Sequence, residues 1–240
     1  MRAPKMMAGL VVAAALVAVA QPAHADVVDV QSCTAAVALP SKLVIKSWNS
    51  IVTARMSDPD DCVSSATWSI TNGTVDTTDS ASFSSPNTVD RVSFYTGPSG
   101  SHAGSYKAVA DYAYSDDTYL DADGFEESVQ VVQEDSEPMV AKYASKLAWK
   151  SVVRSGSHVT LRAVAKRYAL SPGFGGYVAW KHAKALVQKR VGSTWHTVKT
   201  VRTDRKGVAS ARVSGGKHAW RIVTSDSTTI WGSTSSAKRR

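Results

Sequence analysis

Residues 184–202 read KALVQKRVGSTWHTVKTVR, and this stretch indicates the fold class of the second half of the chain. Apolar and polar side chains alternate on both sides of Gly192-Ser193, with the period of two expected for strands that bury one face. Glycine tolerates the positive φ angle that a tight hairpin turn requires. The stretch therefore predicts a β-hairpin with strands at Lys184–Arg190 and Thr194–Arg202.

Similar short strands separated by turn residues recur along the chain. Further hairpin turns are expected at Asp204-Arg205-Lys206-Gly207 and at Gly215-Gly216. The pattern predicts an all-β protein made of two antiparallel β-sandwich domains in tandem. The other expected strands are Lys42–Ser47, Ile51–Met56, Thr67–Thr71, Arg91–Tyr95, Ser105–Tyr114, Glu126–Gln133, Ala144–Lys150, His158–Tyr168, Val208–Val213, His218–Thr224 and Thr229–Ala237.

Charge is divided along the chain. Residues 26–137 contain 18 Asp and Glu against 5 Lys and Arg, whereas residues 138–240 contain 21 Lys and Arg against only Asp204 and Asp226. The segment Gln133–Pro138 is polar and lacks periodicity, and its proline would interrupt a strand ladder. We therefore expect an acidic domain over residues 26–137 and a basic domain over residues 138–240.

The first 25 residues have the three parts of a secretory signal peptide. Arg2 and Lys5 supply a positive start, Met6–Ala20 an apolar core, and Ala23-His24-Ala25 a small-x-small cleavage site. The apolar stretch is shorter than the roughly 18–20 residues of a membrane-spanning helix. We expect a secreted, extracellular protein that begins at Asp26, with association to the cell wall left open.

Cys33 and Cys62 are the only cysteines of the chain. An exported protein folds in an oxidising environment, so a Cys33–Cys62 disulfide is expected. Closing a loop of this length stabilises a domain by roughly 3–4 kcal/mol in the chain-entropy model. A metal-binding thiol is disfavoured because no other Cys or His lies nearby at ligand spacing.

Four segments near the end of the chain form a recognisable set: Ala185–Arg190, Trp195–Asp204, Gly207 and Trp220-Arg221. In these residues the chain resembles an immunoglobulin-like module of secreted and cell-wall proteins of actinobacteria. The match is clearest in the last quarter of the chain and extends loosely over the second domain. The resemblance implies an immunoglobulin-like sandwich without catalytic function, and it carries over no functional residues.

No arrangement typical of an enzyme is present, so no catalytic residue or cofactor is expected, and a hydrolase with an unrecognised site is the least favoured class. Acidic residues crowd around Gly124, but their spacing fails the EF-hand pattern, so a solvated hairpin tip is favoured over calcium and the question for residues 116–127 stays open. No metal site is expected at the histidines of the basic half, which lack a short pair spacing. They are His158, His182, His196 and His218.

The positive charge of the basic half is the main functional signal. A surplus of one sign repels itself and is not needed for solubility, so an anionic partner is implied. Antiparallel strands lie about 5 Å apart, so bases on successive hairpins can align as a stripe. Trp195 and Trp220 are expected in the core, whereas Trp180 and Trp231 are candidates for exposure and stacking on sugars or bases. The expected polyanion-binding residues are Arg162, Lys166, Lys189, Arg190, Lys199, Arg202, Arg212 and Arg221.

Two functions compete on these grounds. The favoured one is a secreted, non-catalytic binding or adhesion protein whose basic domain contacts an anionic cell-wall polymer or an acidic polysaccharide. Extracellular nucleic acid satisfies the same electrostatics but is less favoured. The alternative is a structural protein whose acidic domain docks on its basic domain, without an external polyanion. The sequence leaves the ligand, the domain orientation and the oligomeric state undetermined.

Overall fold

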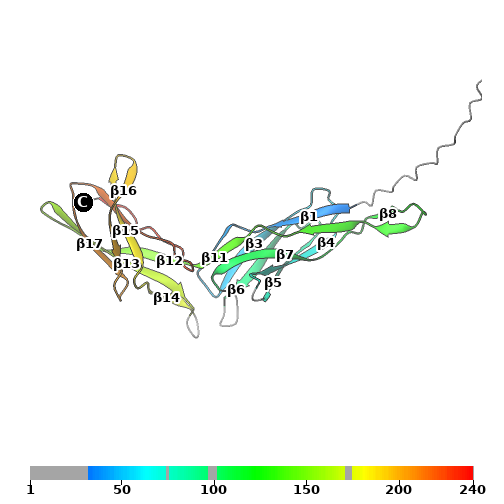
Figure 1. Cartoon of the computed structure of the whole chain (residues 1–240), viewed down its shortest axis with the longest axis horizontal. Helices are drawn as coiled ribbons and strands as arrows, with labels where there is room; N and C mark the ends of the chain where they lie inside the picture. Colours follow the sequence, from blue (N-terminus) through cyan, green and yellow to red (C-terminus); the bar gives the residue numbers. More distant parts are fainter. Residues whose placement is uncertain (1–31, 74–75, 97–101, 171–174, 240) are drawn as a thin grey trace, which may run out of the picture.

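The chain folds into two lobes that lie end to end (Figure 1), here called the N-terminal lobe (residues 32–144) and the C-terminal lobe (residues 145–239). The predicted all-β class is confirmed, because the described residues form strands in packed sheets and no helix occurs among them. They therefore include no apolar helix long enough to span a membrane. The predicted signal peptide, residues 1–25, lies outside the described part of the chain. The computed structural model describes residues 32–73, 76–96, 102–170 and 175–239.

The N-terminal lobe has two main sheets and one projecting hairpin. The first sheet has the strand order β10-β1-β3-β6 and the second has the order β2-β11-β7-β4-β5, whereas β8 and β9 pair only with each other. Burial alternates strictly along β3, as expected for a strand with one face in a core. The strands are β1 (Ser32–Ala38), β2 (Lys42–Ile45), β3 (Asn49–Ser57), β4 (Ser65–Thr71), β5 (Asp76–Ser84), β6 (Val89–Tyr95), β7 (Gly104–Tyr114), β8 (Thr118–Leu120), β9 (Glu126–Ser128), β10 (Gln130–Glu134) and β11 (Met139–Tyr143).

The C-terminal lobe is a second sandwich. Strand β13 pairs with β12 along one edge and with β17 and β14 along the other, and the second sheet has the order β16-β15-β18-β19. The predicted hairpin is confirmed as β15 and β16, with Gly192 at a φ of 61° in its turn. The strands are β12 (Ser145–Ser155), β13 (His158–Ala169), β14 (Gly176–Ala179), β15 (Lys184–Val191), β16 (Thr194–Arg202), β17 (Val208–Ser214), β18 (Ala219–Thr224) and β19 (Lys238–Arg239).

Three features differ from the expected series of antiparallel hairpins. Strands β10 and β11 pair in parallel with β1 and β2, because the first and last strands of the N-terminal lobe run in the same direction. The turns at residues 204–207 and 215–216 are not hairpin turns, since each leads from one sheet of the C-terminal lobe to the other. Residues 229–237 form isolated bridges at Ile230 and Thr234 instead of a strand, because much of this segment bonds to the N-terminal lobe and to Thr224.

The core of the N-terminal lobe has two hallmarks of immunoglobulin sandwiches. Trp68 on β4 is fully buried and donates its indole N–H to the carbonyl of Glu134 at 2.9 Å. The buried hydroxyl of Tyr106 donates to the carbonyl of His102 at 2.8 Å and accepts the amide of the same residue at 3.0 Å, the contact known as a tyrosine corner. Ala108 is buried two residues later, where antibody domains have a cysteine. This lobe is therefore immunoglobulin-like, but its disulfide lies elsewhere.

The tryptophans of the C-terminal lobe are only partly placed as expected. Trp220 is fully buried between the two sheets, so the prediction for it is correct. Trp180 is buried in a small cluster with Ile230, so its expected exposure is wrong. Trp195 is only partly buried, because its register with Arg190 places it on the outer face of an edge strand.

The two lobes are joined without a linker. Strand β11 pairs with β2 and β7 of the N-terminal lobe, and the chain passes through the buried Ala144 directly into β12. The chain thus passes from the N-terminal to the C-terminal lobe at Ala144. The change in the sign of the charge lies earlier, at Pro138. Tyr168 of β13 is buried in the core of the N-terminal lobe. Separate folding of the acidic and basic segments remains a prediction.

Trp231 fills the junction between the lobes. Its ring lies against the ammonium groups of Lys42 and Lys142, at 3.9 and 4.5 Å from the ring centroid. Its indole N–H donates to the carbonyl of Leu43 at 2.9 Å. Trp231 therefore holds the lobes together, and its expected role as an exposed stacking residue is not supported.

Candidate anion-binding surfaces

The structure does not bring the eight predicted bases together on one face. Strand register places three of them on the outer face of the β12-β13-β17 sheet and three on the outer face of the β16-β15-β18 sheet. The remaining two lie on the inward side of the latter sheet, toward its edges. The three groups are Arg162, Lys166 and Arg212; Arg190, Arg202 and Arg221; and Lys189 and Lys199.

On the outer face of the β12-β13-β17 sheet, like charges lie next to each other. Lys166 on β13 lies directly opposite Lys146 on β12, and like charges in this position destabilise a strand pair. Arg162 pairs with Ser210 and Arg212 pairs with Thr160, so the two arginines are diagonal neighbours on adjacent strands. A bound anion would reduce the repulsion on this face.

Arg221 is the most constrained base of the β16-β15-β18 sheet. Its guanidinium lies 4.4 Å from the ring centroid of Trp195, and its Nε donates to Oε1 of Gln188 at 2.7 Å. A cation–π contact of this kind fixes the plane of the guanidinium over the indole. The ring of Trp195 is therefore covered on one side by an arginine.

A groove of about 430 Å³ gathers further cations at the free end of the C-terminal lobe. The side chains of Arg190, Lys217 and Arg239 line it, together with His218. Arg190 is held by a bond from its Nε to the carbonyl of Gly192 at 3.0 Å. We refer to Arg190, Lys217, Arg239 and His218 as the cationic groove.

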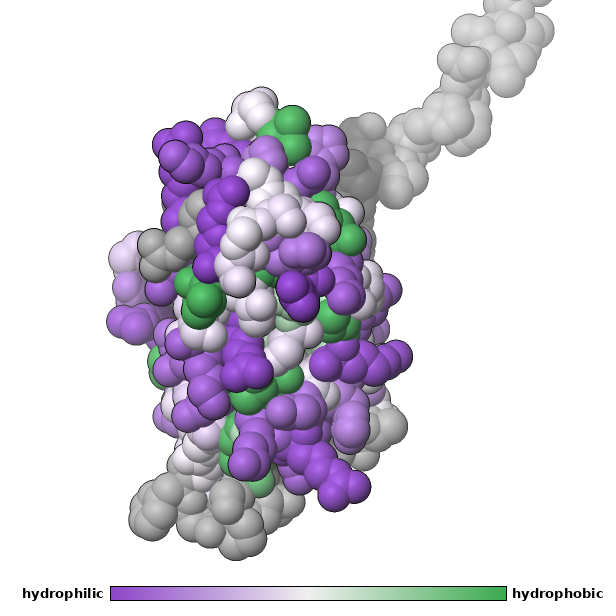
Figure 2. All heavy atoms as spheres, turned by 90° about the vertical axis from the view of Figure 1, so that its left-hand side faces the viewer, coloured by the Kyte–Doolittle hydropathy of each residue, from purple (hydrophilic) through white to green (hydrophobic). Residues whose placement is uncertain are grey.

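Sequence reasoning found only Arg190 among the residues of the cationic groove. Lys217 lies in the connection between sheets, and Arg239 is brought to the site by pairing with Ala219. Neither position belongs to an alternating strand pattern, so only the tertiary pairing reveals them. Figure 2 shows this end of the molecule as mainly hydrophilic, with scattered hydrophobic residues.

The two acids of the basic half both have local partners. Asp204 accepts the backbone N–H groups of Lys206 and Val208 at 2.8 Å, and the bond from Val208 is the main cause of its lowered pKa. Asp226 accepts the N–H of Gly232 and lies 3.9 Å from Lys142. This is the one ion pair found among the described residues of the basic half. The other described bases between residues 138 and 239 have no described carboxylate within ion-pairing distance.

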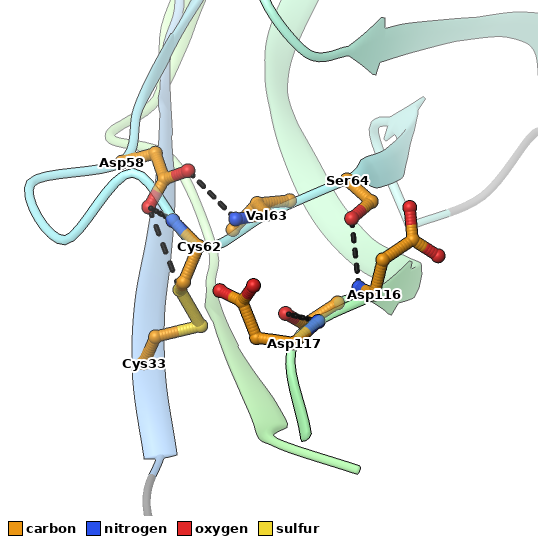
Figure 3. The surroundings of a disulfide bond; sticks show 8 residues. Cys33, Asp58, Cys62, Val63, Ser64, Asp116 and Asp117 are labelled. Atoms are coloured by element: carbon orange, nitrogen blue, oxygen red, sulfur yellow. Dashed lines mark hydrogen bonds between the residues drawn. A yellow bond between two sulfur atoms is a disulfide. The ribbon is translucent and has the colours of Figure 1, made fainter. Parts of the chain in front are cut away.

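The Cys33–Cys62 disulfide is confirmed, and it supports the base of the β8–β9 hairpin (Figure 3). The carboxylate of Asp58 accepts the N–H groups of Cys62 and Val63, which fixes the loop after the bridge. The next residue, Ser64, accepts the N–H of Asp116 through its hydroxyl at 2.8 Å. The disulfide loop and the start of the hairpin are thus bonded to each other.

The acidic loop around Gly124 forms the predicted hairpin tip. Gly124 has a φ of 83°, and one carboxylate oxygen of Asp121 accepts the N–H groups of Asp123 and Phe125 at 3.0 and 2.8 Å. Within the described residues, His, Cys, Asp and Glu form no cluster of three or more that could hold a metal ion. The carboxylate of Asp121 therefore acts as a turn acceptor.

No protein-family model matches the chain, and neither does any curated protein. Among solved structures, the chain is similar to the BSP domain of a biofilm-associated protein, with 13% identity over 87% of this chain and 28% of that chain and a TM-score of 0.25. The chain thus spans little more than a quarter of that protein. It is also similar to the D00-D0 domain of intimin, with 10% identity over 85% of this chain and 98% of that chain and a TM-score of 0.28. Scores this low do not establish a common overall fold, so no property of these proteins is transferred.

Proposed function

We propose that this chain is a secreted, non-catalytic binding or adhesion protein whose C-terminal lobe contacts an anionic polymer of the cell envelope. The observation that carries the proposal is the surplus of bases in residues 138–240, which include the C-terminal lobe. Residues 138–240 contain 21 Lys and Arg and only two acids, both of which have local partners. A polyanion would reduce the repulsion between these bases and would release counterions when it binds.

Two surfaces are suited to successive anionic groups of a polymer. The cationic groove offers three charged side chains around one hollow, and the β12-β13-β17 face offers Arg162, Lys166 and Arg212. Arginine and lysine bind phosphate and carboxylate through charge-assisted hydrogen bonds. We place the main contact in the groove, because its cations converge from three separate segments of the chain.

Nucleic acid is less well suited to these surfaces than a polymer without bases. Recognition of single strands relies on exposed aromatic rings on which bases stack. Trp180 and Trp220 are buried, Trp231 is held in the junction, and Arg221 covers Trp195 on one side. We therefore propose a wall polymer that carries phosphate groups, or an acidic polysaccharide.

We favour this proposal over the alternative in which the acidic part neutralises the basic part. Among the described residues, no carboxylate of residues 26–137 lies within 4.0 Å of a base of residues 138–240. The junction consists of Trp231, Tyr168 and backbone bonds, and its ion pair joins Lys142 to Asp226 within the second half. The absence of such pairs among the described residues supports the proposal of an external partner.

The test is binding of residues 26–240 to linear polyphosphate and, separately, to a carboxylate polysaccharide, at several salt concentrations. Three groove contacts predict a loss of roughly 20- to 40-fold in affinity between about 50 and 200 mM salt, because each contact releases counterions. Binding to only one of the two polymers shows whether the protein recognises phosphate or carboxylate groups. Salt-independent binding, or no binding to either polymer at low salt, would reject the proposal.

A matched pair of variants locates the contact. R190E/K217E reverses two charges in the groove, whereas R55E/R91E makes the same change of net charge on exposed positions of the N-terminal lobe. We expect the groove variant to bind polyphosphate at least 10-fold more weakly than the control variant. Equal losses in both variants would indicate only a general effect of net charge.

A further inference from the structure

The free end of the N-terminal lobe carries a group of exposed apolar side chains. Tyr112 and Tyr114 on β7 are 58% and 42% exposed, and Leu120 and Phe125 on the adjoining hairpin are 66% and 67% exposed. The rings of Tyr112 and Tyr114 lie 5.9 Å apart, and Leu120 and Phe125 follow on the hairpin that begins after β7. Exposed large apolar side chains are typical of surfaces that bind another protein. We call Tyr112, Tyr114, Leu120 and Phe125 the apolar tip.

The apolar tip is presented on an anchored structure. Ser64, which follows the disulfide loop, donates its N–H to the carbonyl of Tyr114 at 3.1 Å and accepts the N–H of Asp116 through its hydroxyl. At the other side of the hairpin base, the N–H of Val129 donates to the carbonyl of Asp117 at 3.0 Å. A preformed projection loses less conformational entropy on binding than a free loop does.

The charge around the apolar tip specifies the chemistry of its partner. No Lys or Arg occurs from residue 108 to residue 141, whereas acids flank the exposed apolar residues throughout the hairpin. An interface with an apolar centre and an acidic rim selects a partner surface with a cationic rim. The acids are Asp111, Asp116, Asp117, Asp121, Asp123, Glu126 and Glu127.

A surface of that kind lies at the opposite end of the same molecule. The cationic groove is lined by Arg190, Lys217 and Arg239, and Val191, which is 47% exposed, directly follows Arg190 in the chain. In Figure 1, β8 and the C-terminus lie at opposite ends of the elongated molecule. The two complementary surfaces cannot meet within one chain, but they can meet between two chains.

We propose that the protein assembles head to tail, with the β8–β9 hairpin and apolar tip of one copy docked on the cationic groove of the next. Because the two surfaces differ and lie at opposite ends, each added copy exposes a new hairpin and a new groove. Such heterologous contacts produce open linear chains unless their rotation closes a ring. The inference goes beyond polymer binding, and it predicts that a polyanion bound in the groove displaces the hairpin.

The first test is sedimentation of residues 26–240 over a range of protein concentrations at low and at high salt. We expect the weight-average mass to rise with concentration at low salt and to return toward the monomer at high salt, because charged rims are screened. Polyphosphate should also lower the mass at low salt. A mass that stays at the monomer at all concentrations and at low salt overturns the proposal.

A charge-exchange experiment tests the geometry of the contact. Asp123 and Glu127 are exposed, and their carboxylates make no hydrogen bond within the described part of the chain, so D123K/E127K should preserve the hairpin. We expect D123K/E127K and R190E/K217E each to be monomeric alone and to associate when mixed, since each supplies the charge that the other lost. Failure of the mixture to associate, or wild-type association of either variant alone, contradicts the head-to-tail contact.

The apolar contribution is tested with L120S/F125S against the control V153S, which alters another exposed apolar residue. We expect self-association to weaken at least 10-fold in L120S/F125S and to stay within twofold of the wild type in V153S. Equal effects in the two variants would contradict the proposed role of the tip. D123K/E127K retains the cationic groove, so its binding to polyphosphate reports on the proposed function separately and confirms that the variant is folded.

Discussion

Replacement of Trp231 by alanine tests how firmly the two lobes are fixed to each other. The change removes the hydrogen bond to the carbonyl of Leu43, worth about 1 kcal/mol, and two cation–π contacts worth about 0.5–1 kcal/mol each. The coupling free energy between the lobes should therefore fall by about 2–3 kcal/mol. In a chain of this size each kcal/mol corresponds to roughly 2–4 °C in Tm.

The assay combines calorimetry with small-angle X-ray scattering of residues 26–240. For W231A we expect a lower Tm, a broader or divided unfolding transition, and a wider distribution of interatomic distances, because the lobes would move relative to each other. The matched control is W195A, which removes an indole and one cation–π contact wholly within the C-terminal lobe. Wild-type scattering and unfolding in W231A, or the same change of scattering in W195A, would refute the role assigned to the junction.

Three further changes test the N-terminal lobe. C33A/C62A should lower the free energy of unfolding by roughly 3–4 kcal/mol in the chain-entropy model, and urea unfolding of the reduced wild type should show a similar loss. Y106F removes the hydroxyl that bonds both backbone groups of His102, so it should cost about 1–3 kcal/mol in urea unfolding, whereas the exposed Y112F should stay within about 0.5 kcal/mol. The hydrogen bond from Lys107 holds the pKa of Asp135 below its ordinary value of 3.8, so this carboxylate stabilises the fold above that pH and loses the effect as the pH falls through its lowered pKa. Urea midpoints of wild type and D135N should therefore converge on acidification, and a constant difference would contradict this assignment.

The strands that sequence reasoning predicted well are those in which apolar and polar residues alternate regularly in the sequence. β13, β15 and β16 start and end within a residue or two of their predicted bounds, because alternation is regular there. β5 was not predicted, since its Ser- and Thr-rich sequence resembles a solvated loop and it is ordered by pairing with β4. β14 was also missed, because it is short and depends on pairing with the end of β13.

The charge of the candidate site was readable from the sequence, but its distribution over the two sheets was not. Which face a side chain occupies depends on the connections between sheets and on irregularities such as the one at Val187/Gln188. The sequence suggested a single stripe because every turn was taken as a hairpin. Two of those turns instead cross between sheets, which places Arg212 on one sheet and Arg190 on the other.

Strand β11 leads directly into β12 through Ala144, so the number of residues in this connection determines how the lobes are rotated relative to each other. Successive side chains of an extended segment point in opposite directions, so one inserted residue would turn the following strand by half a rotation. The cationic faces would then point away from their present direction, and Tyr168 and Trp231 would lose their contacts with the N-terminal lobe. The relative orientation of the surfaces at the two ends therefore depends on whether the extended connection has an odd or an even number of residues.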